Sequence, residues 1–249
     1  MDPTVRATLV GLNRTFYARF AVDFARTRSG WPAGFDRILP YLRPAANVLD
    51  LGCGNGRLLT FLAKHNWNGQ YVGADSSRAL LDFAEQAAVR AADAGARIDA
   101  RFEFVDFAEQ YWTSTLGTSA FDAITALAVL HHIPGRAQRT EFLAACQALL
   151  QPQGVLVLST WQFLTAPRLR AHILPWETIG LTSSRVEAGD YLLSWGEGAV
   201  GQRYCAAIDE DELATEASPA GLSMGGSFRG DGREGNLNLY AMLQRVSPG

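Results

Sequence analysis

The stretch VLDLGCGNGR, from Val48 to Arg57, places three glycines directly behind a short apolar run. A glycine-rich turn after a strand lets a bound nucleotide approach the backbone closely. Gly52 and Gly54 fit the first two positions of the dinucleotide fingerprint G-x-G-x-x-G, but Arg57 stands at the third. No Gly-Lys-Ser or Gly-Lys-Thr follows, so the loop is not a P-loop either. The pattern G-x-G-x-G predicts a nucleotide-containing ligand that neither fingerprint describes.

Strand and helix patterns alternate around this loop. Apolar runs typical of strands occupy residues 47–53, 69–75, 100–107, 121–133 and 154–161, and helical spacing occupies residues 35–42, 57–66, 76–95, 136–154 and 209–221. Ser76 or Ser77 is expected to cap the helix that Gly95 ends. Residues 222–246 read as two strands joined by a glycine-rich turn. We therefore predict an α/β, Rossmann-like fold: a seven-stranded, mostly parallel sheet with a C-terminal antiparallel hairpin and helices on both faces.

Composition limits the class of protein. The 22 Lys and Arg nearly balance the 25 Asp and Glu, and the net charge of −3 argues against a nonspecific nucleic-acid coat. Three widely separated cysteines indicate reduced thiols and a cytosolic setting. The N-terminus has no apolar signal core, and no apolar run reaches the length that crosses a membrane. We therefore expect a cytoplasmic protein without a membrane partner.

Two aspartates stand at predicted strand ends. Asp75 ends the second strand and Asp106 ends the third. The carboxyl ends of parallel strands line one ligand crevice. There Asp75 is placed to accept hydrogen bonds from two ribose hydroxyls, and Asp106 is placed to meet the amino group of an adenine. Acidic residues suit a ligand with a ribose, an adenine and a cationic centre better than they suit a pyrophosphate.

The blocks LDLGCGNGR, GADSS, FVDFA and VLHHI, in this order, resemble class I S-adenosylmethionine-dependent methyltransferases. The resemblance covers the chain from about Phe35 to Trp161, and the terminal hairpin completes the fold. It implies an enzyme that binds S-adenosyl-L-methionine through the glycine loop and the following strand ends. The residues so implied are Asp50, Gly52, Cys53, Gly54, Asn55, Gly56, Asp75, Ser76, Asp106, Phe107 and Leu127. The alternative to a cofactor site is that these glycines form only a tight turn and that the aspartates only cap helices.

A closer resemblance covers more of the chain. The blocks RTRSGWP, LGCGNGR, VLHHI, LVLSTW, DYLLSWG, RYC and DGREGNLNLY are similar to the tRNA wobble-uridine carboxymethyl methyltransferase family and its bacterial relatives. This resemblance implies esterification of 5-carboxymethyluridine, with tRNA as a partner. Cys205 and Ala206 depart from the family pattern, which has an aromatic residue and a histidine there. A small protein partner stays open, because eukaryotic members of the family work with a zinc-binding one.

The acceptor side is expected to carry arginines. An ionised carboxylate acceptor needs no base, whereas an amine or a hydroxyl more often does. Arg203, Arg229 and Arg233 border the presumed acceptor side, and a guanidinium fork suits a carboxylate. We expect Arg203 or Arg233 to pair with the acceptor carboxylate, and Tyr204 or Trp195 to stack on a base. The alternative is that the arginines are solvated and the aromatic rings belong to the core of a lid.

Two histidines end the predicted fourth strand, close to the point of methyl transfer. Neighbouring strand residues point to opposite faces, so at most one of His131 and His132 is expected to reach the site. That histidine would act as a base or position the acceptor, and a structural role is the alternative. His65 and His172 show no metal-ligand spacing with this pair, so no metal site is expected.

The segments outside the alternating pattern complete the prediction. Residues 1–34 read as one or two helices, with Phe16, Phe20 and Phe24 in one stripe, and residues 162–203 look irregular. We expect a single methyltransferase domain over residues 1–249, with residues 162–203 as an inserted lid or acceptor-binding segment. Residues 1–34 would cover the cofactor, chiefly through Tyr17, Arg28 and Trp31. A small-molecule methyltransferase and a non-catalytic cofactor-binding protein are the alternative functions.

Overall fold

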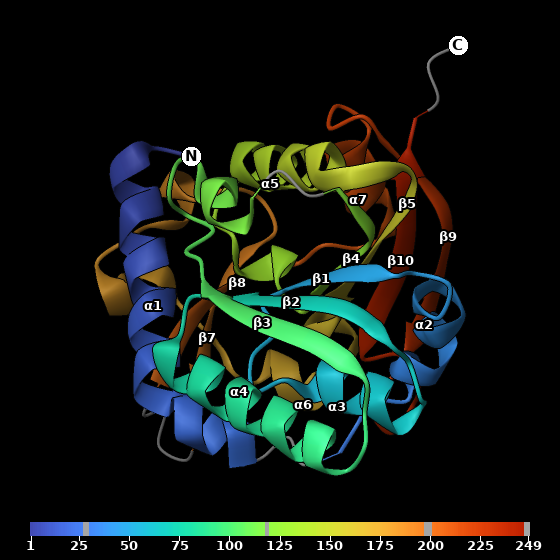
Figure 1. The fold of residues 1–249 in the computed structure, drawn as a ribbon. Helices are drawn as coiled ribbons and strands as arrows, with labels where there is room; N and C mark the ends of the chain where they lie inside the picture. Colours follow the sequence, from blue (N-terminus) through green and yellow to red (C-terminus); the bar gives the residue numbers. More distant parts are fainter. Residues whose placement is uncertain (27–29, 118–119, 197–200, 247–249) are drawn as a thin grey trace.

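A computed structural model of the chain describes residues 1–26, 30–117, 120–196 and 201–246 (Figure 1). Its main feature is a seven-stranded sheet in the order β3-β2-β1-β4-β5-β10-β9. Strands β1 to β5 pair in parallel, whereas β10 runs antiparallel to both β5 and β9. The strands are β1 (Asn47–Leu51), β2 (Gly69–Asp75), β3 (Ile98–Phe104), β4 (Phe121–Leu127), β5 (Leu150–Trp161), β9 (Leu222–Gly230) and β10 (Asn238–Arg245). The predicted fold class is confirmed.

Helices cover both faces of this sheet (Figure 1). Helices α5 and α7 pack on one face, and α2, α3 and α4 pack on the other. The helices are α1 (Pro3–Arg26), α2 (Gly34–Leu42), α3 (Arg57–Lys64), α4 (Arg78–Asp93), α5 (Arg136–Leu149), α6 (Pro167–Arg170) and α7 (Glu210–Ala217). Ser77 caps α4 by accepting a hydrogen bond from the Leu80 amide, and Gly95 follows its last turn with φ +91°, as the sequence predicted. No helix among the described residues is long and apolar enough to cross a membrane.

The N-terminal segment forms one helix, α1, rather than two. It lies along β8 and alongside the carboxyl ends of the parallel strands (Figure 1). Val5 and Leu9 of α1 are buried in the same core as β1 and β4, and burial of each such side chain contributes about 1.5–3 kcal/mol. Phe16 and Phe20 are buried as the stripe predicts, while the side chain of Phe24 lies outside what the structure describes.

The segment 162–203 is more regular than the sequence indicated. It contains most of a second sheet, antiparallel, of β6 (Ile173–Leu174), β7 (Asp190–Trp195) and β8 (Gly201–Ala206). Short 3₁₀ turns precede or separate these strands: η3 (Phe163–Thr165), η4 (Trp176–Ile179) and η5 (Ser183–Arg185). The strands escaped prediction because β6 is two residues long, and because Leu192 and Leu193 of β7 are both buried, which removes the alternating pattern.

Strand four also ends earlier than predicted. β4 stops at Leu127, and Ala128 adopts a left-handed conformation with φ +60°. A left-handed residue cannot continue a strand, so the chain turns into the 3₁₀ helix η2 (Leu130–His132). His131 and His132 therefore lie on a helical turn behind the strand. Asp106 likewise lies two residues beyond the end of β3.

Candidate functional site

A cavity of about 1120 Å³ opens at the carboxyl ends of the parallel strands. Its walls come from α1, from the loops after β1, β2, β3 and β4, and from the ends of β5, β8 and β10. Ligand pockets commonly measure about 300–1,000 Å³, so this cavity has room for two small molecules side by side. The position agrees with the rule that ligands bind outside the carboxyl ends of an open α/β sheet.

The glycine loop forms the floor of the cavity, and each of its glycines has a different role. Gly52, Gly54 and Gly56 all have φ between +55° and +77°, a conformation that favours glycine. A Cβ at Gly52 would lie 2.3 Å from Val129, so this position needs glycine for packing. A Cβ at Gly54 would meet no atom within 4 Å, which leaves open space above the loop. Gly56 does not line the cavity; a Cβ there would lie 3.1 Å from the Cα of Ala84, so glycine lets α3 approach α4 closely.

Asp75 is held in the cavity wall by backbone amides. Its Oδ2 accepts from Gly54 N and its Oδ1 accepts from Ser77 N, both at 2.9 Å. Burial raises the pKa of Asp75 to about 6, although these hydrogen bonds oppose the rise. Each carboxylate oxygen can accept a further hydrogen bond. Asp75 thus presents two acceptors at fixed positions beside the glycine loop.

Asp50 lies deeper and connects three strands. Its Oδ2 accepts from the Tyr71 hydroxyl of β2 at 2.5 Å, and its Oδ1 accepts from the Thr125 hydroxyl of β4 at 2.6 Å. The residue is 3% exposed, and burial raises its pKa to about 6 despite both hydrogen bonds. Its carboxylate therefore fixes the position of β1 beneath the cavity through neighbouring side chains.

Asp106 is bonded to α1 at the other end of the cavity. Its Oδ2 accepts from Arg14 Nε at 2.6 Å, and Arg14 also reaches Glu109 at 2.8 Å. Next to it, the Phe107 ring packs edge-on against Trp112 and Phe142. An apolar ring beside an acceptor oxygen suits a flat base with an amino group.

The family model described as a methyltransferase domain matches residues 24–224, which is well over half of the chain. The chain belongs to this methyltransferase family. The chain therefore carries a methyltransferase domain, and it shares the fold of solved S-adenosylmethionine-dependent methyltransferases.

Curated relatives match one half of this methyltransferase. Two proteins named ubiquinone biosynthesis O-methyltransferase are similar to it, one from Actinobacillus pleuropneumoniae and one from Xanthomonas axonopodis pv. citri. The first is 34% identical over 128 residues, which cover 49% of this chain and 51% of the relative. The second is 33% identical over 132 residues, which cover 52% of this chain and 49% of the relative. The chain spans about half the length of these curated relatives.

Solved structures share the fold across most of the chain. A methyltransferase from Methanosarcina mazei has a TM-score of 0.66 at 21% identity and covers 85% of this chain and 98% of its own. The magnesium protoporphyrin IX methyltransferase from Synechocystis, crystallised with SAH, has a TM-score of 0.64 at 18% identity and covers 94% and 99%. At these identities the likeness establishes the fold alone.

The cavity fits S-adenosyl-L-methionine. Open space lies above Gly54, and Asp75 offers two fixed acceptors for a diol. Most of the cofactor residues expected from the sequence line the same cavity: Tyr17, Asp50, Gly52, Cys53, Gly54, Asn55, Asp75, Ser76, Asp106, Phe107 and Leu127. Trp31 lies outside it, 45% exposed and bonded to Thr60, and Arg28 lies outside the described residues. The role of each residue stays a prediction.

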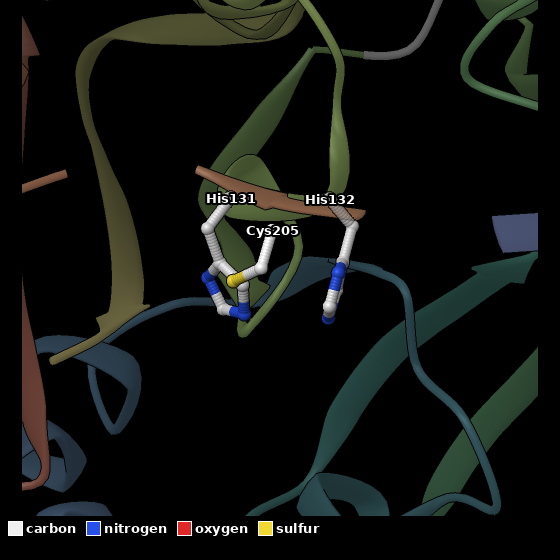
Figure 2. Close-up of side chains that lie close together, drawn as sticks. All are labelled: His131, His132 and Cys205. Carbon is white, nitrogen blue, oxygen red and sulfur yellow. The ribbon is translucent and has the colours of Figure 1, made fainter. Parts of the chain in front are cut away.

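Both histidines of η2 line the cavity, contrary to the expectation that at most one would. That expectation assumed a strand, and a 3₁₀ turn does not alternate its side chains. Figure 2 shows the two rings close together, with the Cys205 side chain of β8 next to the His131 ring. The His131 Nδ1 accepts from Trp161 N at 3.3 Å. The His132 Nδ1 lies 3.2 Å from the Tyr204 carbonyl, and its Nε2 lies 2.8 Å from the Tyr17 hydroxyl.

Sequence reasoning missed the cluster of His131, His132 and Cys205, whose possible ligand atoms lie within 4.8 Å of one another. Its donor set would suit a thiophilic metal, but its surroundings do not. The Nδ1 of His131 already accepts a backbone amide, so the proton of the neutral ring sits on Nε2. Burial raises the pKa of Cys205 to about 12, and the nearby Arg203 cation would repel a metal ion. We therefore assign no metal to this cluster.

Arg203 is the predicted acceptor residue that fits the cavity best. It lines the cavity, is 7% exposed, and stacks against Trp161 and Phe16 at 4.8 Å and 5.2 Å. Its Nε is buried without a hydrogen-bond partner among the described residues. A buried cation without an anion is costly, so the site favours a negatively charged ligand.

The other acceptor candidates lie elsewhere. Tyr204 has no exposed surface, and its hydroxyl donates to Asp190 at 2.6 Å, so its ring has no face on which a base could stack. This follows from strand alternation, because Arg203 takes the cavity face of β8. Arg233 is exposed in the turn between β9 and β10 and does not line the cavity. Trp195 packs against Phe16 and Phe20 instead.

Proposed function

We propose that this methyltransferase transfers a methyl group to an oxygen of a small, negatively charged molecule. The single observation that carries the proposal is Arg203, a buried guanidinium in the cavity wall whose Nε has no partner among the described residues. The names of the curated relatives, ubiquinone biosynthesis O-methyltransferases, support an oxygen acceptor on a small molecule.

Two arginines in the cavity wall would hold two separate anionic groups. Arg57 begins α3 beside the glycine loop, lines the cavity, and has a buried Nε without a partner among the described residues. It suits the carboxylate of the cofactor, because it directly follows the glycine loop. Arg203 stands on β8, on the same strand face as Cys205 two residues on, about 7 Å away. Since the Cys205 Sγ lies within 4.8 Å of a ring nitrogen of both His131 and His132, Arg203 suits an acceptor placed near those histidines.

The chain's own groups supply proton transfer and alignment. S-adenosyl-L-methionine, when bound, supplies a methyl group on a positively charged sulfur that an acceptor oxygen displaces. The Tyr204 carbonyl keeps the His132 Nδ1 protonated, so the Nε2 lone pair takes the proton of an acceptor hydroxyl that replaces the Tyr17 hydroxyl. The Arg203 guanidinium holds the acidic group and so orients the hydroxyl.

The test uses methyl-labelled cofactor and three acceptor pools. These are a panel of small hydroxy carboxylic acids, the same panel as neutral amides, and bulk tRNA. We expect label in the acids and much less in the amides. Label in tRNA, released by mild alkali as an ester would be, would overturn the proposal in favour of the tRNA wobble-uridine reaction. Label in no pool would favour a cofactor-binding protein without catalysis.

Substitution of Arg203 gives the first residue-level prediction. Arg203→Met should lower kcat/KM for the acids by about 10- to 100-fold, because a charge-assisted hydrogen bond contributes about 1.5–3 kcal/mol. The affinity for the cofactor should stay the same. Arg229→Met is the matched control, since Arg229 is exposed, bonds to Gln162 and does not line the cavity. Equal losses for acids and cofactor would contradict the assignment.

A further inference from the structure

The side chain of Asn13 joins three elements at the edge of the cavity. Asn13 lies on α1 and is 8% exposed. Its Oδ1 accepts from Tyr204 N at 2.8 Å, and its Nδ2 donates to Tyr204 O at 3.3 Å, so the carboxamide pairs with β8 as a neighbouring strand would. The same Nδ2 donates to His132 O at 3.0 Å. One amide therefore fixes the backbone of η2 relative to the backbone of β8.

The ring of His132 depends on the same backbone. Its Nδ1 lies 3.2 Å from the Tyr204 carbonyl, and a carbonyl oxygen only accepts, so Nδ1 carries the proton. In the neutral ring Nε2 then has a lone pair, which accepts from the Tyr17 hydroxyl at 2.8 Å. Tyr17 follows Asn13 by one helical turn, so both side chains reach the site from one face of α1.

We propose that Asn13 is a positioning residue that fixes the tautomer of His132. By pairing with both backbone groups of Tyr204 and with the His132 carbonyl, it holds the Tyr204 carbonyl at the Nδ1 of the ring. The Nδ1–H tautomer is then retained, and the Nε2 lone pair faces the cavity wall that Tyr17 shares. The proposal rests on the proposed function only for its catalytic consequence; the tautomer itself is a property of the free protein.

Chemistry singles out asparagine at this position. Aspartate has the same shape but only accepts, so Asn13→Asp would set a carboxylate oxygen against the carbonyls of Tyr204 and His132. Asn13→Ala removes all three hydrogen bonds and leaves their backbone partners unpaired. Leu9→Ala is the matched control, because Leu9 is a fully buried residue of the same helix and makes none of these contacts.

The decisive measurement is long-range ¹H–¹⁵N NMR of the full chain labelled at histidine. The chain has four histidines, and His132→Gln identifies the signals of His132. We expect wild type and Leu9→Ala to show the Nδ1–H tautomer, and Asn13→Asp and Asn13→Ala to show a mixture or the Nε2–H form. An Nε2–H tautomer in the wild type, or an equal change in Leu9→Ala, would overturn the proposal.

Kinetics separates this inference from the proposed function. Asn13→Ala should lower kcat for the hydroxy acids by about tenfold or more, as expected when a general base loses its alignment, with cofactor affinity unchanged. The NMR experiment needs no acceptor. A wild type with the Nδ1–H tautomer that methylates no acid would overturn the proposed function alone. An active enzyme in which the His132 tautomer stays the same after substitution of Asn13 would overturn the positioning role alone.

Discussion

Single residues in the cavity wall have chemical properties that their sequence neighbours do not reveal. Asp75 and Asp50 both end up with a pKa of about 6, and in both burial is the main cause. Asp75 is only partly buried and accepts from the backbone amides of Gly54 and Ser77, whereas Asp50 is 3% exposed and accepts from the hydroxyls of Tyr71 and Thr125. The two aspartates thus differ in exposure and in hydrogen-bond partners, and Asp75 is the one placed to contact a ligand diol.

Substitution of Asp75 should weaken cofactor binding. Asp75→Ala removes two fixed acceptors, so we expect the Kd for S-adenosylhomocysteine, measured by calorimetry, to rise by about 10- to 100-fold. Asp122→Ala is the control, because Asp122 accepts from Ala46 N and Asn47 N at the amino end of β1, away from the cavity. A similar rise in Asp122→Ala would contradict a direct role for Asp75.

The affinity for the same compound should also depend on pH. Protonation of Asp75 removes acceptor capacity for a diol, so wild-type affinity should fall as the pH drops through about 6. The Asp75→Ala variant should lack that step. Calorimetry between pH 5 and pH 8 checks both curves, and a step of equal size in the variant would assign it to another group.

At the scale of elements, α1 completes the site. It supplies Asn13 and Tyr17 to the His132 side of the cavity and Arg14 to Asp106 at the opposite side. The apolar stripe of Phe16 and Phe20 predicts a packed helix, but it gives no indication of which polar residues between those rings would reach the cavity. That depends on the docking of α1 on β8, a contact between segments about 190 residues apart.

Helices α5 and α7 are joined by a buried ion pair. Arg139 of α5 and Glu216 of α7 are 3% and 0% exposed, and their closest atoms are 2.6 Å apart. Glu216→Gln leaves the Arg139 charge buried without its full partner, so the free energy of unfolding should fall by about 3–5 kcal/mol. Chemical denaturation measures this loss.

The double variant Arg139→Met with Glu216→Leu should recover most of that loss, because it removes both charges. Arg136→Met is the surface comparison. Arg136 pairs with Glu212 through two bonds of 2.7 and 2.8 Å but is half exposed, so its loss should cost under about 1 kcal/mol. If Glu216→Gln were no less stable than Arg136→Met, the buried Arg139–Glu216 pair would not have the importance assigned to it.

For the whole molecule, Asp50 should make folding stability depend on pH. Its folded-state pKa of about 6 exceeds the usual 3.8, so the folded protein holds the proton more tightly than the unfolded chain. The stabilising contribution is therefore full below pH 4 and is lost as the pH rises through about 6. The difference in unfolding free energy between wild type and Asp50→Asn should fall by up to about 3 kcal/mol between pH 4 and pH 7. A pH-independent difference in urea denaturation would contradict the assignment.

The fold and half of the site could be predicted from local patterns. Short apolar runs, a glycine-rich loop and aspartates at strand ends identify the parallel sheet and the cofactor side. Each of these signals lies within about ten residues of chain, and the geometry of parallel strands brings the strand ends together. The acceptor side was predicted less well. Arg203 lines the cavity, but Tyr204 faces the core and Arg233 remains outside.

The sequence by itself determined the alternation of strands and helices, the glycine loop and the position of Asp75 at a strand end, because periodicity and turn chemistry are local properties of the chain. Only the tertiary structure decided the environment of Arg203, the contacts of Asn13 and the placement of both histidines in one wall. Those features depend on a left-handed Ala128 that ends β4 and on the packing of α1 and β8 across the sheet ends. Such contacts join distant segments, and their energy comes from burial and hydrogen bonding that no local pattern encodes.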